Sequence, residues 1–379
     1  MPDLFLDPEN IRELCAYCGI TSEDQVALLG LAAHISSQPD LLELARRVHH
    51  NTYSAWEADD PPTPTLETAF GEQAAVLYVL IGLDGMRLIR AAQAKRGVPA
   101  AITKASCDAP AVGLRRYRRL CGKIGMDRWV LGWFHYLMGG DLYRLGRLQF
   151  IPRAYEAHIV VYEHKRSGHV QAFAVPGQHF DTDGYPINDA QHLNDGVWTS
   201  ELHEDEDIVS GTPISPHGMA LRQPITLKLA EWSRVLGNGD PVLEMHIPDN
   251  DPITIDILRD SFAQAAAFFP RYYPECVYKA FVCESWMFNT QLQDMLPDQS
   301  SLVQFQKQGY LIPQLAEPEY MLYFIFGRKQ VDLTTAPRNT TLRRAVIAHL
   351  EAGQSLRNGG WFLLKQDLPH FGQQPYMNK

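Results

Sequence analysis

The pattern of this sequence changes once, close to Gly139-Gly140, and that change limits the folds open to the chain. Before the two glycines, apolar residues recur every three to four positions, which is the period of an α-helix. From Leu142 onward they form short apolar or alternating runs bounded by Gly, Pro, Asn and Asp, as is typical of strands. The sequence therefore predicts an α+β protein, with an all-helical domain over residues 1–140 and a mixed α/β domain over residues 141–379.

Local signals in the first domain favour helices. Ser22, followed by Gln25 three positions later, has the form of a capping box ahead of an apolar run. The helical period continues through residues 66–94, and Gly82 and Gly85 are the two positions where it could be interrupted, because glycine weakens a helix interior. We expect helices throughout this domain.

In the second domain, short runs alternate with three helical patterns. The expected strands are residues 146–151, 157–163, 170–175, 225–229, 242–247, 277–283, 320–326 and 361–364, and the expected helices are residues 253–269, 300–308 and 339–350. No internal repeat and no low-complexity segment occurs. A strand followed by a helix and another strand is typical of a sheet with parallel pairing.

Composition excludes several partners. The formal net charge of −10 does not suit a protein that binds a phosphate backbone, so no nucleic-acid partner is expected. The arginine cluster at residues 115–119 is expected to be a solvated helix face, with an anion contact as the alternative. No run approaches the ~20 apolar residues that a membrane span needs, and the first residues lack the features of a signal peptide. These observations predict a cytoplasmic protein with no membrane partner.

The sequence gives no convincing metal site. Cys15 and Cys18 form a single CxxC pair with no second pair at suitable spacing, and they fit the apolar side of an early helix. The acidic run 203–207 is expected to be a solvated loop, and Asp181-Thr-Asp-Gly184 a hairpin turn. P-loop, GxGxxG, GxSxG and HExxH motifs are absent, which removes the commonest nucleotide, hydrolase and zincin chemistries.

The most informative stretch is residues 240–326. An expected strand over 242–247 is followed by the turn Pro248-Asp-Asn-Asp-Pro252 and the helix over 253–269. A strand that feeds a turn and a helix directs the unpaired N–H groups of the helix toward the end of the strand, where they can hold an anion such as a pyrophosphate. A purely structural connection is the alternative.

Several strings in this domain resemble a known family. They are RLGRLQF (144–150), GTPISPHG (211–218), LEMHIP (243–248), SFAQAAAFF (261–269), CESW (283–286), SSLVQFQ (300–306) and TLRRAVIAHLEAG (341–353), in this order. The chain resembles a family of bacterial proteins that have a helical N-terminal N-acyltransferase domain and a GNAT-like C-terminal domain. The resemblance spans nearly the whole chain.

The resemblance implies an N-acyltransferase that moves an acyl group from acyl-CoA, or another acyl carrier, to a small-molecule amine, with no metal. In that register residues 242–247 would be the fourth GNAT strand, whose backbone pairs with pantetheine as far as Ile247. The turn would hold the pyrophosphate, with Asn250 and Thr254 as its expected contacts. Residues 277–283 would be the fifth strand.

Acyl transfer to an amine needs a base for the ammonium proton. Glu244 and His246 alternate on the expected fourth strand and so share one face of the sheet, while Glu284 ends the fifth. These three are the candidate catalytic residues. The expected substrate pocket consists of Ser285, Trp286, Arg144 and Arg147.

Two departures from the GNAT pattern support an alternative function. The glycine-rich pyrophosphate signature is absent, and two acids occupy the turn. The tyrosine that often protonates the leaving thiolate in GNAT enzymes is replaced by Phe305, in the segment Phe305-Gln-Lys-Gln-Gly-Tyr310. The alternative is a catalytically silent GNAT-like module that binds a small ligand or a protein partner.

Overall fold

The structure, a computed structural model, describes residues 3–54, 63–137, 139–188, 196–249 and 252–377. The chain divides into two compact units. The first contains the chain up to Ile151 together with a short segment that begins at Ile247. The second contains the residues from Pro152 to His246 and those from Pro252 onward.

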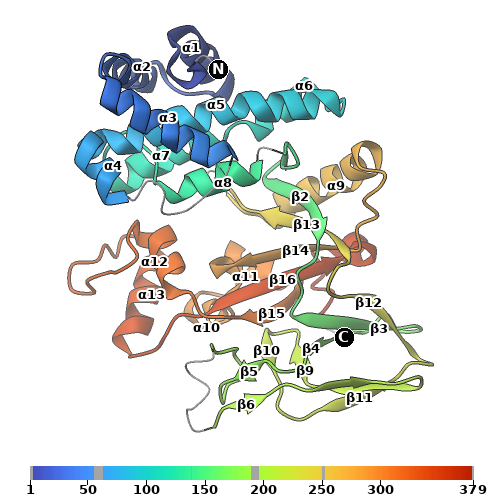
Figure 1. Cartoon of the computed structure of the whole chain (residues 1–379). Helices are drawn as coiled ribbons and strands as arrows, with labels where there is room; N and C mark the ends of the chain where they lie inside the picture. The colour runs from blue at the N-terminus through green and yellow to red at the C-terminus, as the bar shows by residue number, and fades with distance from the viewer. Residues whose placement is uncertain (1–2, 55–62, 138, 189–195, 250–251, 378–379) are drawn as a thin grey trace. The chain divides into compact units, whose positions relative to one another are not determined.

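The first unit is helical up to residue 137 within its described residues, as the sequence predicts (Figure 1). Its elements are η1 (Leu4–Leu6), α1 (Pro8–Cys18), α2 (Ser22–Ser36), α3 (Pro39–Ser54), α4 (Thr63–Phe70), η2 (Gly71–Gln73), α5 (Ala74–Lys95), α6 (Ala100–Ser106), α7 (Ala109–Cys121) and α8 (Trp129–Leu137). The strands β1 (Tyr143–Leu145) and β2 (Leu148–Ala154) then form an antiparallel hairpin.

Helix α5 is the centre of the first unit, and its two inner glycines do not interrupt it. A Cβ on Gly82 would lie 2.5 Å from the ring of Phe134 on α8, and a Cβ on Gly85 would lie 2.3 Å from the hydroxyl of Tyr53 on α3. The helix therefore continues through both possible interruptions. Glycine has a low helix propensity, but the absence of a side chain lets the neighbouring helices pack closely against α5.

The start of α2 also differs by one residue from the expected capping box. Thr21 is the N-cap, and its hydroxyl oxygen accepts a hydrogen bond from the Asp24 N–H at 3.2 Å. The same hydroxyl donates to the Asp24 carboxylate at 2.8 Å. The cap is therefore one position before Ser22, and Asp24 bonds the hydroxyl of Thr21 rather than its backbone N–H, so the full capping box is not formed.

The second unit contains the sheets. Its elements are β3 (Ile159–His164), β4 (Val170–Ala174), β5 (His179–Phe180), β6 (Trp198–Thr199), β7 (Leu202–Glu204), β8 (Ile208–Gly211), β9 (Pro213–Ser215), β10 (Met219–Ala220), β11 (Ile225–Lys228), β12 (Trp232–Leu236), β13 (Pro241–His246), α9 (Ile255–Tyr272), β14 (Ala280–Ser285), η4 (Trp286–Phe288), α10 (Leu292–Met295), α11 (Ser301–Gln306), β15 (Tyr310–Gln314), α12 (Pro318–Phe326), α13 (Thr341–Glu351), β16 (Asn358–Leu364) and η5 (Lys365–His370).

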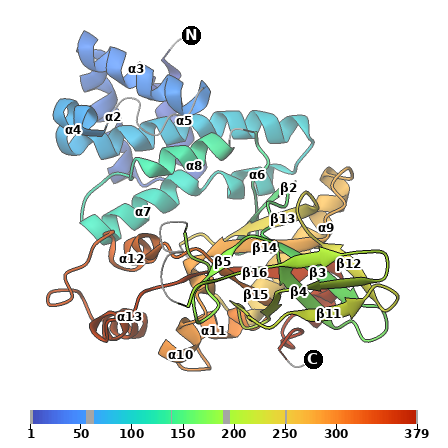
Figure 2. The same ribbon diagram turned by 60° about the horizontal axis from the view of Figure 1, so that its bottom comes forward.

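Four strands of the main sheet lie in the order β13, β14, β16, β15 (Figure 2). A five-stranded antiparallel sheet has the order β10, β9, β4, β3, β12, and a three-stranded one the order β11, β8, β7. Tyr310 of β15 connects the first two sheets, because its buried hydroxyl donates to the Ile214 carbonyl and accepts from the Ala172 N–H.

Strands β13 and β14 are parallel, and α9 lies between them in the chain, as the strand–helix–strand pattern predicts. Their register pairs Val242 with Ala280 and ends with Glu244 opposite Val282. Both strands continue beyond these residues, to His246 and Ser285, without further pairing to each other. The ladder between the two strands therefore ends before their carboxyl ends, and their divergence there stays a prediction.

One expected strand is wrong. Residues 320–326 form most of helix α12, which begins with Pro318 in its first turn and ends at Gly327 in the left-handed conformation. Met321 and Ile325 pack in a cluster with Val346 of α13. A short apolar run has no decisive period, so the flanking proline and glycine were the better signals here. The strand β15, which directly precedes this helix, was not expected.

A buried ion pair inside the helical unit gives a test of stability. Asp84 of α5 has a side chain that is 2% exposed, with Oδ2 3.0 Å from His49 Nε2 and Oδ1 3.2 Å from Arg87 Nε. Burial raises the pKa of Asp84, but its bonds to His49 and Arg87 outweigh this, and the net pKa is lowered. Since the folded pKa is below the unfolded one, the carboxylate stabilises the fold above the unfolded pKa.

We expect Asp84→Asn to lower the free energy of unfolding by about 1–3 kcal/mol at neutral pH. The difference from the parent should shrink as pH falls through the folded pKa of Asp84, because protonation removes the same charge. Urea unfolding over a pH series measures this, with the exposed Glu43→Gln on α3 as control. A pH-independent difference would contradict the assignment.

The division after residue 140 remains a proposal that fragments can test. Leu142 and Ile151 belong to the buried cluster of the helical unit, and Gln93 Nε2 donates to the carbonyls of Gly140 and Leu142 at 3.1 and 2.9 Å. We expect a fragment of residues 1–151 to melt at a higher temperature than residues 1–140 by circular dichroism. Equal melting temperatures would place the boundary at residue 140.

Candidate active site

The end of β13 carries two of the expected catalytic side chains. His246 Nε2 lies 3.1 Å from Glu244 Oε1, and both side chains are about a quarter exposed. The other carboxylate oxygen of Glu244 lies 2.6 Å from Arg153 Nε at the end of β2. Alternation along β13 places Glu244 and His246 on one face, so the strand itself brings the imidazole and the carboxylate together.

The third expected residue, Glu284, shares this face. Glu244 is in register with Val282, and Glu284 follows two positions later on β14. Gln314 of β15 donates a hydrogen bond from Nε2 to Glu284 Oε1 at 2.8 Å. Glu284 remains open to solvent. The structure thus places all three candidate residues toward the carboxyl ends of the two parallel strands.

The two carboxyl groups have opposite pKa shifts. Burial raises the pKa of Glu244, but His246 and then Arg153 outweigh it, so its net pKa is lowered. For Glu284, partial burial raises the pKa, and the negative charge of Glu244 adds to this against the opposing effects of His158 and Gln314. Two carboxyl groups whose environments separate their pKa values are typical of acid–base sites.

The sequence did not predict the neighbouring residues that shift the pKa values of Glu244 and Glu284. Arg153, His158 and Gln314 lie at strand ends or in a connection, where no local motif marks them. Tyr155 is buried, and burial, together with the charge of Glu284, raises the pKa of its phenol. The sheet register brings these residues to the site, although they lie 30 or more positions in the sequence from the carboxyl groups that they affect.

Two of the expected pocket residues follow β14 directly. Ser285 caps η4, since its hydroxyl oxygen accepts from the Met287 N–H at 3.2 Å. Trp286 stacks on Phe324 of α12 with ring centroids 6.4 Å apart and packs on a buried apolar cluster. Phe305, in the place of the GNAT tyrosine, is fully buried between Phe288 and Trp361.

The other expected pocket residues belong to the first unit. Arg144 is buried, with Nη1 2.7 Å from the Asp108 carboxylate and Nε donating to the Gly146 carbonyl. Arg147 is buried as well. These contacts are those of residues that hold the β1–β2 hairpin, and a role for them in a substrate pocket stays a prediction.

The residues that were expected to contact the acyl donor lie in different parts of the structure. Thr254 is the N-cap of α9, where its hydroxyl oxygen accepts from the Ile257 N–H at 3.4 Å. Ile247 is half-buried and groups with the first unit. Asn250 lies outside the described residues. Thr254 has the helix-start role that the sequence predicts, and donor binding by these residues stays a prediction.

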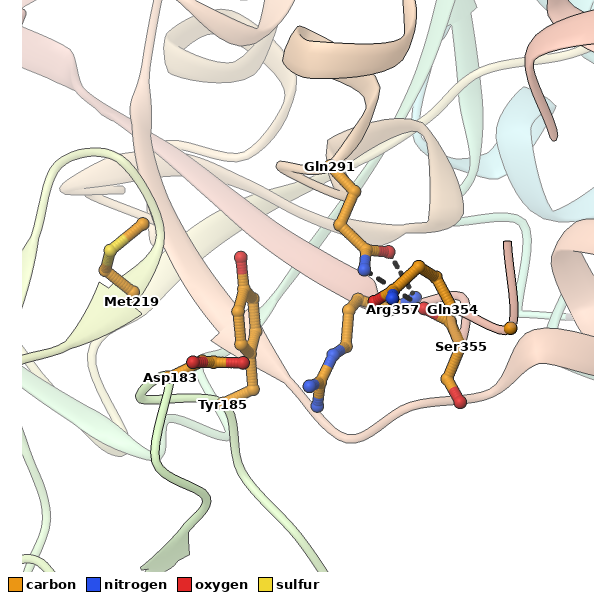
Figure 3. Close-up of a pocket in the computed structure, with 8 residues that line it drawn as sticks. Asp183, Tyr185, Met219, Gln291, Gln354, Ser355 and Arg357 are labelled. Carbon is orange, nitrogen blue, oxygen red and sulfur yellow. Dashed lines mark hydrogen bonds between the residues drawn. The ribbon is translucent and has the colours of Figure 1, made fainter. Parts of the chain in front are cut away.

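The second unit contains a pocket of about 490 Å³ that sequence reasoning did not anticipate (Figure 3). Its lining includes Asp183, Tyr185, Met219, Gln291 and Arg357. The Arg357 guanidinium lies 4.4 Å from the centre of the Tyr185 ring and 2.7 Å from the Asp181 carboxylate. No hydrogen bond or ion pair is found for the Asp183 carboxylate among the described residues.

Strand register connects this pocket to Glu284. Arg357 directly precedes β16, whose first residue Asn358 pairs with Gln314, the residue that bonds Glu284. Glu284 itself pairs with Gly360 on the same strand. The pocket and Glu284 therefore lie toward the same end of the sheet.

The fold defines a GNAT-like protein, and comparison with known families agrees with it. Residues 142–363 match the GNAT-like C-terminal domain, and residues 9–138 match the N-acyltransferase N-terminal domain. The first match covers more than half of the chain, so the protein belongs to this two-domain family. No curated protein matches the sequence.

Solved structures of acyltransferases share the fold. One, a tryptophan-to-alanine variant in complex with octanoyl-CoA, has a TM-score of 0.63 and 21% identity, covering 94% of this chain and 88% of that one. Another, in complex with decanoyl-CoA and teicoplanin, has a TM-score of 0.62 and 22% identity over the same shares. Among the described residues, no group of His, Cys, Asp and Glu could hold a metal ion, and no helix is long and apolar enough to span a membrane.

The coupling between the two carboxyl groups can be measured directly. Because the charge of Glu244 raises the pKa of Glu284, we expect Glu244→Gln to lower that pKa. A carbon-13 NMR titration of the glutamate carboxyl groups, assigned with Glu284→Gln, measures the change. The exposed Glu206→Gln in the β7–β8 turn is the control. An unchanged Glu284 pKa would show that the two groups do not interact.

Proposed function

We propose that this protein is an N-acyltransferase that transfers an acyl group from acyl-CoA, or from another acyl thioester carrier, to an amine. The observation that carries the proposal is the end of the β13–β14 ladder at Glu244, with Glu244, His246 and Glu284 on one face at that point. Open α/β sheets bind ligands beyond the carboxyl ends of their strands. The family and the acyl-CoA complexes of proteins with the same fold support it.

The proposed donor site uses the backbone of β13. Beyond Glu244 this strand makes no ladder pairs with β14. An extended pantetheine arm can therefore enter between the two strands and hydrogen-bond to the backbone of β13 where β14 does not pair with it. An extended chain added to a strand edge gains regular backbone hydrogen bonds. The thioester would then lie near the last residues of β13.

In the proposed reaction Glu284 is the general base. Because its pKa is raised, Glu284 binds a proton near neutral pH more readily than an ordinary glutamate does. Glu284 takes the proton of the ammonium group, the amine nitrogen attacks the thioester carbonyl, and the C–N bond forms as the C–S bond breaks. The acylated nitrogen releases its extra proton to solvent, and the thiolate leaves with the proton that the carboxyl group has taken up. Amide, thiol and one released proton then balance the ammonium and the thioester.

His246 is proposed to assist in positioning the amine. His246 and Arg153 lower the pKa of Glu244, and the His246 ring lies 3.1 Å from the Glu244 carboxylate, which holds the ring in place. An imidazole fixed at the end of β13 can orient the acceptor or the developing oxyanion. The pocket around Tyr185 and Asp183 is the proposed acceptor site, because it lies toward the same end of the sheet as Glu284.

Donor binding and turnover test the proposal. We expect octanoyl-CoA to raise the melting temperature of the protein, because a ligand that binds only the folded state stabilises it. With a panel of amines, Glu284→Gln should lower kcat by about 10²–10⁴, the usual contribution of a general base. His246→Ala should lower kcat as well, and neither variant should change the affinity for CoA.

The exposed Glu206→Gln serves as the matched control, with unchanged kcat and melting temperature. Binding of CoA without turnover of any amine would favour the alternative, a silent GNAT-like binding module. No binding of CoA at millimolar concentration by calorimetry would remove the proposed donor.

A further inference from the structure

Gln314 of β15 reaches Glu284 of β14 across a strand that lies between them. The order of these strands in the sheet is β14, β16, β15 (Figure 1). Neighbouring strands lie about 4.8 Å apart, so β14 and β15 are separated by about 10 Å. Even so, Gln314 Nε2 donates a hydrogen bond to Glu284 Oε1 at 2.8 Å. The two side chains therefore meet over β16 rather than over their own strands.

The register of the strands shows how this contact is possible. Glu284 is paired with Gly360 of β16, and Gly360 is paired with Ile312 of β15. Residues in such a row point to the same face of a sheet, and so does Gln314, which lies two positions after Ile312. The middle position of the row has no side chain. The path across β16 is therefore open on the face that carries Glu284 and Gln314.

Gly360 provides space, and its backbone conformation does not require a glycine. Its φ lies outside the left-handed region that favours glycine. A Cβ at this position would lie 3.0 Å from Gln314 Nε2, and 2.5 and 2.7 Å from the Cγ1 and Cδ1 atoms of Ile312. A side chain at residue 360 would therefore press on the amide that holds Glu284 as well as on Ile312.

The hydrogen bond from Gln314 occupies one oxygen of the Glu284 carboxylate. Among the described residues, no hydrogen bond or ion pair is found for the other oxygen, Oε2. A base that is held by one oxygen presents the other in a fixed direction, which proton transfer requires. Because an amide is uncharged, it also lowers the basicity of the carboxylate less than a guanidinium such as that of Arg153, which holds Glu244.

We propose that Gln314 is a positioning residue for the general base: its bond to Oε1 directs Oε2 of Glu284 toward the amine, and residue 360 is a glycine because this bond passes over it. The inference rests on the proposed function, in which Glu284 takes the ammonium proton. Gln314 acts only through Glu284 and touches neither the amine nor the acyl donor. Its loss therefore changes the direction and the basicity of Glu284, whereas loss of Glu284 removes the base itself.

Other ionisable groups also act on Glu284, from several elements. They are Glu244 of β13, Cys283 of β14, Tyr155 and His158 in the connection after β2, and Glu317 before α12. A change at residue 314 leaves all of these groups in place. Because the Gln314 N–H favours the ionised form of the carboxyl group, its removal should raise the pKa of Glu284. This is opposite in sign to the effect expected for Glu244→Gln.

Gln314→Met keeps the length of the side chain and removes the N–H donor. We expect the pKa of Glu284, measured by carbon-13 NMR titration, to rise, and the acidic limb of the kcat/KM profile to move to higher pH with it. Above that limb Glu284 is ionised in both proteins, but kcat should still fall by up to about 10²-fold, because the carboxylate is no longer directed. If Gln314 only packed there, methionine would replace it with little loss. Gln299→Met, at an exposed glutamine, is the control.

Gly360→Ala tests the path across β16. It should raise the pKa of Glu284 in the parent but not in Gln314→Met, because no amide is then left to displace. An equal rise in both backgrounds, or no rise in the parent, would overturn the role of Gly360.

The remaining outcomes separate this inference from the proposed function. An unchanged pKa of Glu284 in Gln314→Met would overturn the inference. If that pKa rises but kcat above the limb equals that of the parent, Gln314 does not position the base, and the proposed function stands. If the parent acylates no amine, the proposed function is wrong, and the NMR titration alone then decides whether Gln314 holds Glu284.

Discussion

Parallel pairing between β13 and β14 ends at Glu244 and Val282, although both strands continue for two or three more residues. The rest of the candidate site depends on this one break in the ladder. In the paired part the side chains pack on the core, with Leu243 and Phe281 fully buried. Beyond it, β13 makes no further ladder pairs with β14, and this is where we propose that an extended ligand binds.

The break also explains why two similar carboxyl groups behave differently. Glu244 lies on the last paired position, next to a cation and an imidazole, so its ionised form is stabilised. Glu284 lies beyond the paired part, bonded by a neutral amide and repelled by Glu244, so its ionised form is less favoured. A module that only binds a ligand has no need for this separation, whereas acyl transfer needs one group that accepts a proton. The electrostatics thus favour the enzyme over the silent module.

The sequence predicted the parts of the fold that local patterns determine. The change at residues 139–142, the parallel strand pair and the cap at Thr254 are all set by neighbouring residues, and the structure contains them. Glu244, His246 and Glu284 could be predicted as one group because strand alternation and parallel register fix their common face. The site partners that β2 and β15 supply could not be predicted, since non-local register brings them to the site.

The wrong predictions of secondary structure are also explained by contacts between residues that are distant in the sequence. Helix α12 was expected as a strand because a seven-residue apolar run fits either structure, and its packing on α13 decided the outcome. Gly82 and Gly85 were possible interruptions of α5, but tertiary contacts with Phe134 and Tyr53 outweigh the cost in helix propensity.

The acidic turn after β13 shows the same principle at the site. In the sequence, an acid where a phosphate should bind counts against a phosphate ligand, because only neighbours along the chain are visible. In the structure, Arg116 and Arg119 of α7, 130 or more positions earlier in the chain, contact that acid. The two guanidinium groups neutralise an acid that has no cation near it in the sequence. The charge of Asp249 can therefore be judged only with its partners from α7, and the sequence does not show which residues these are.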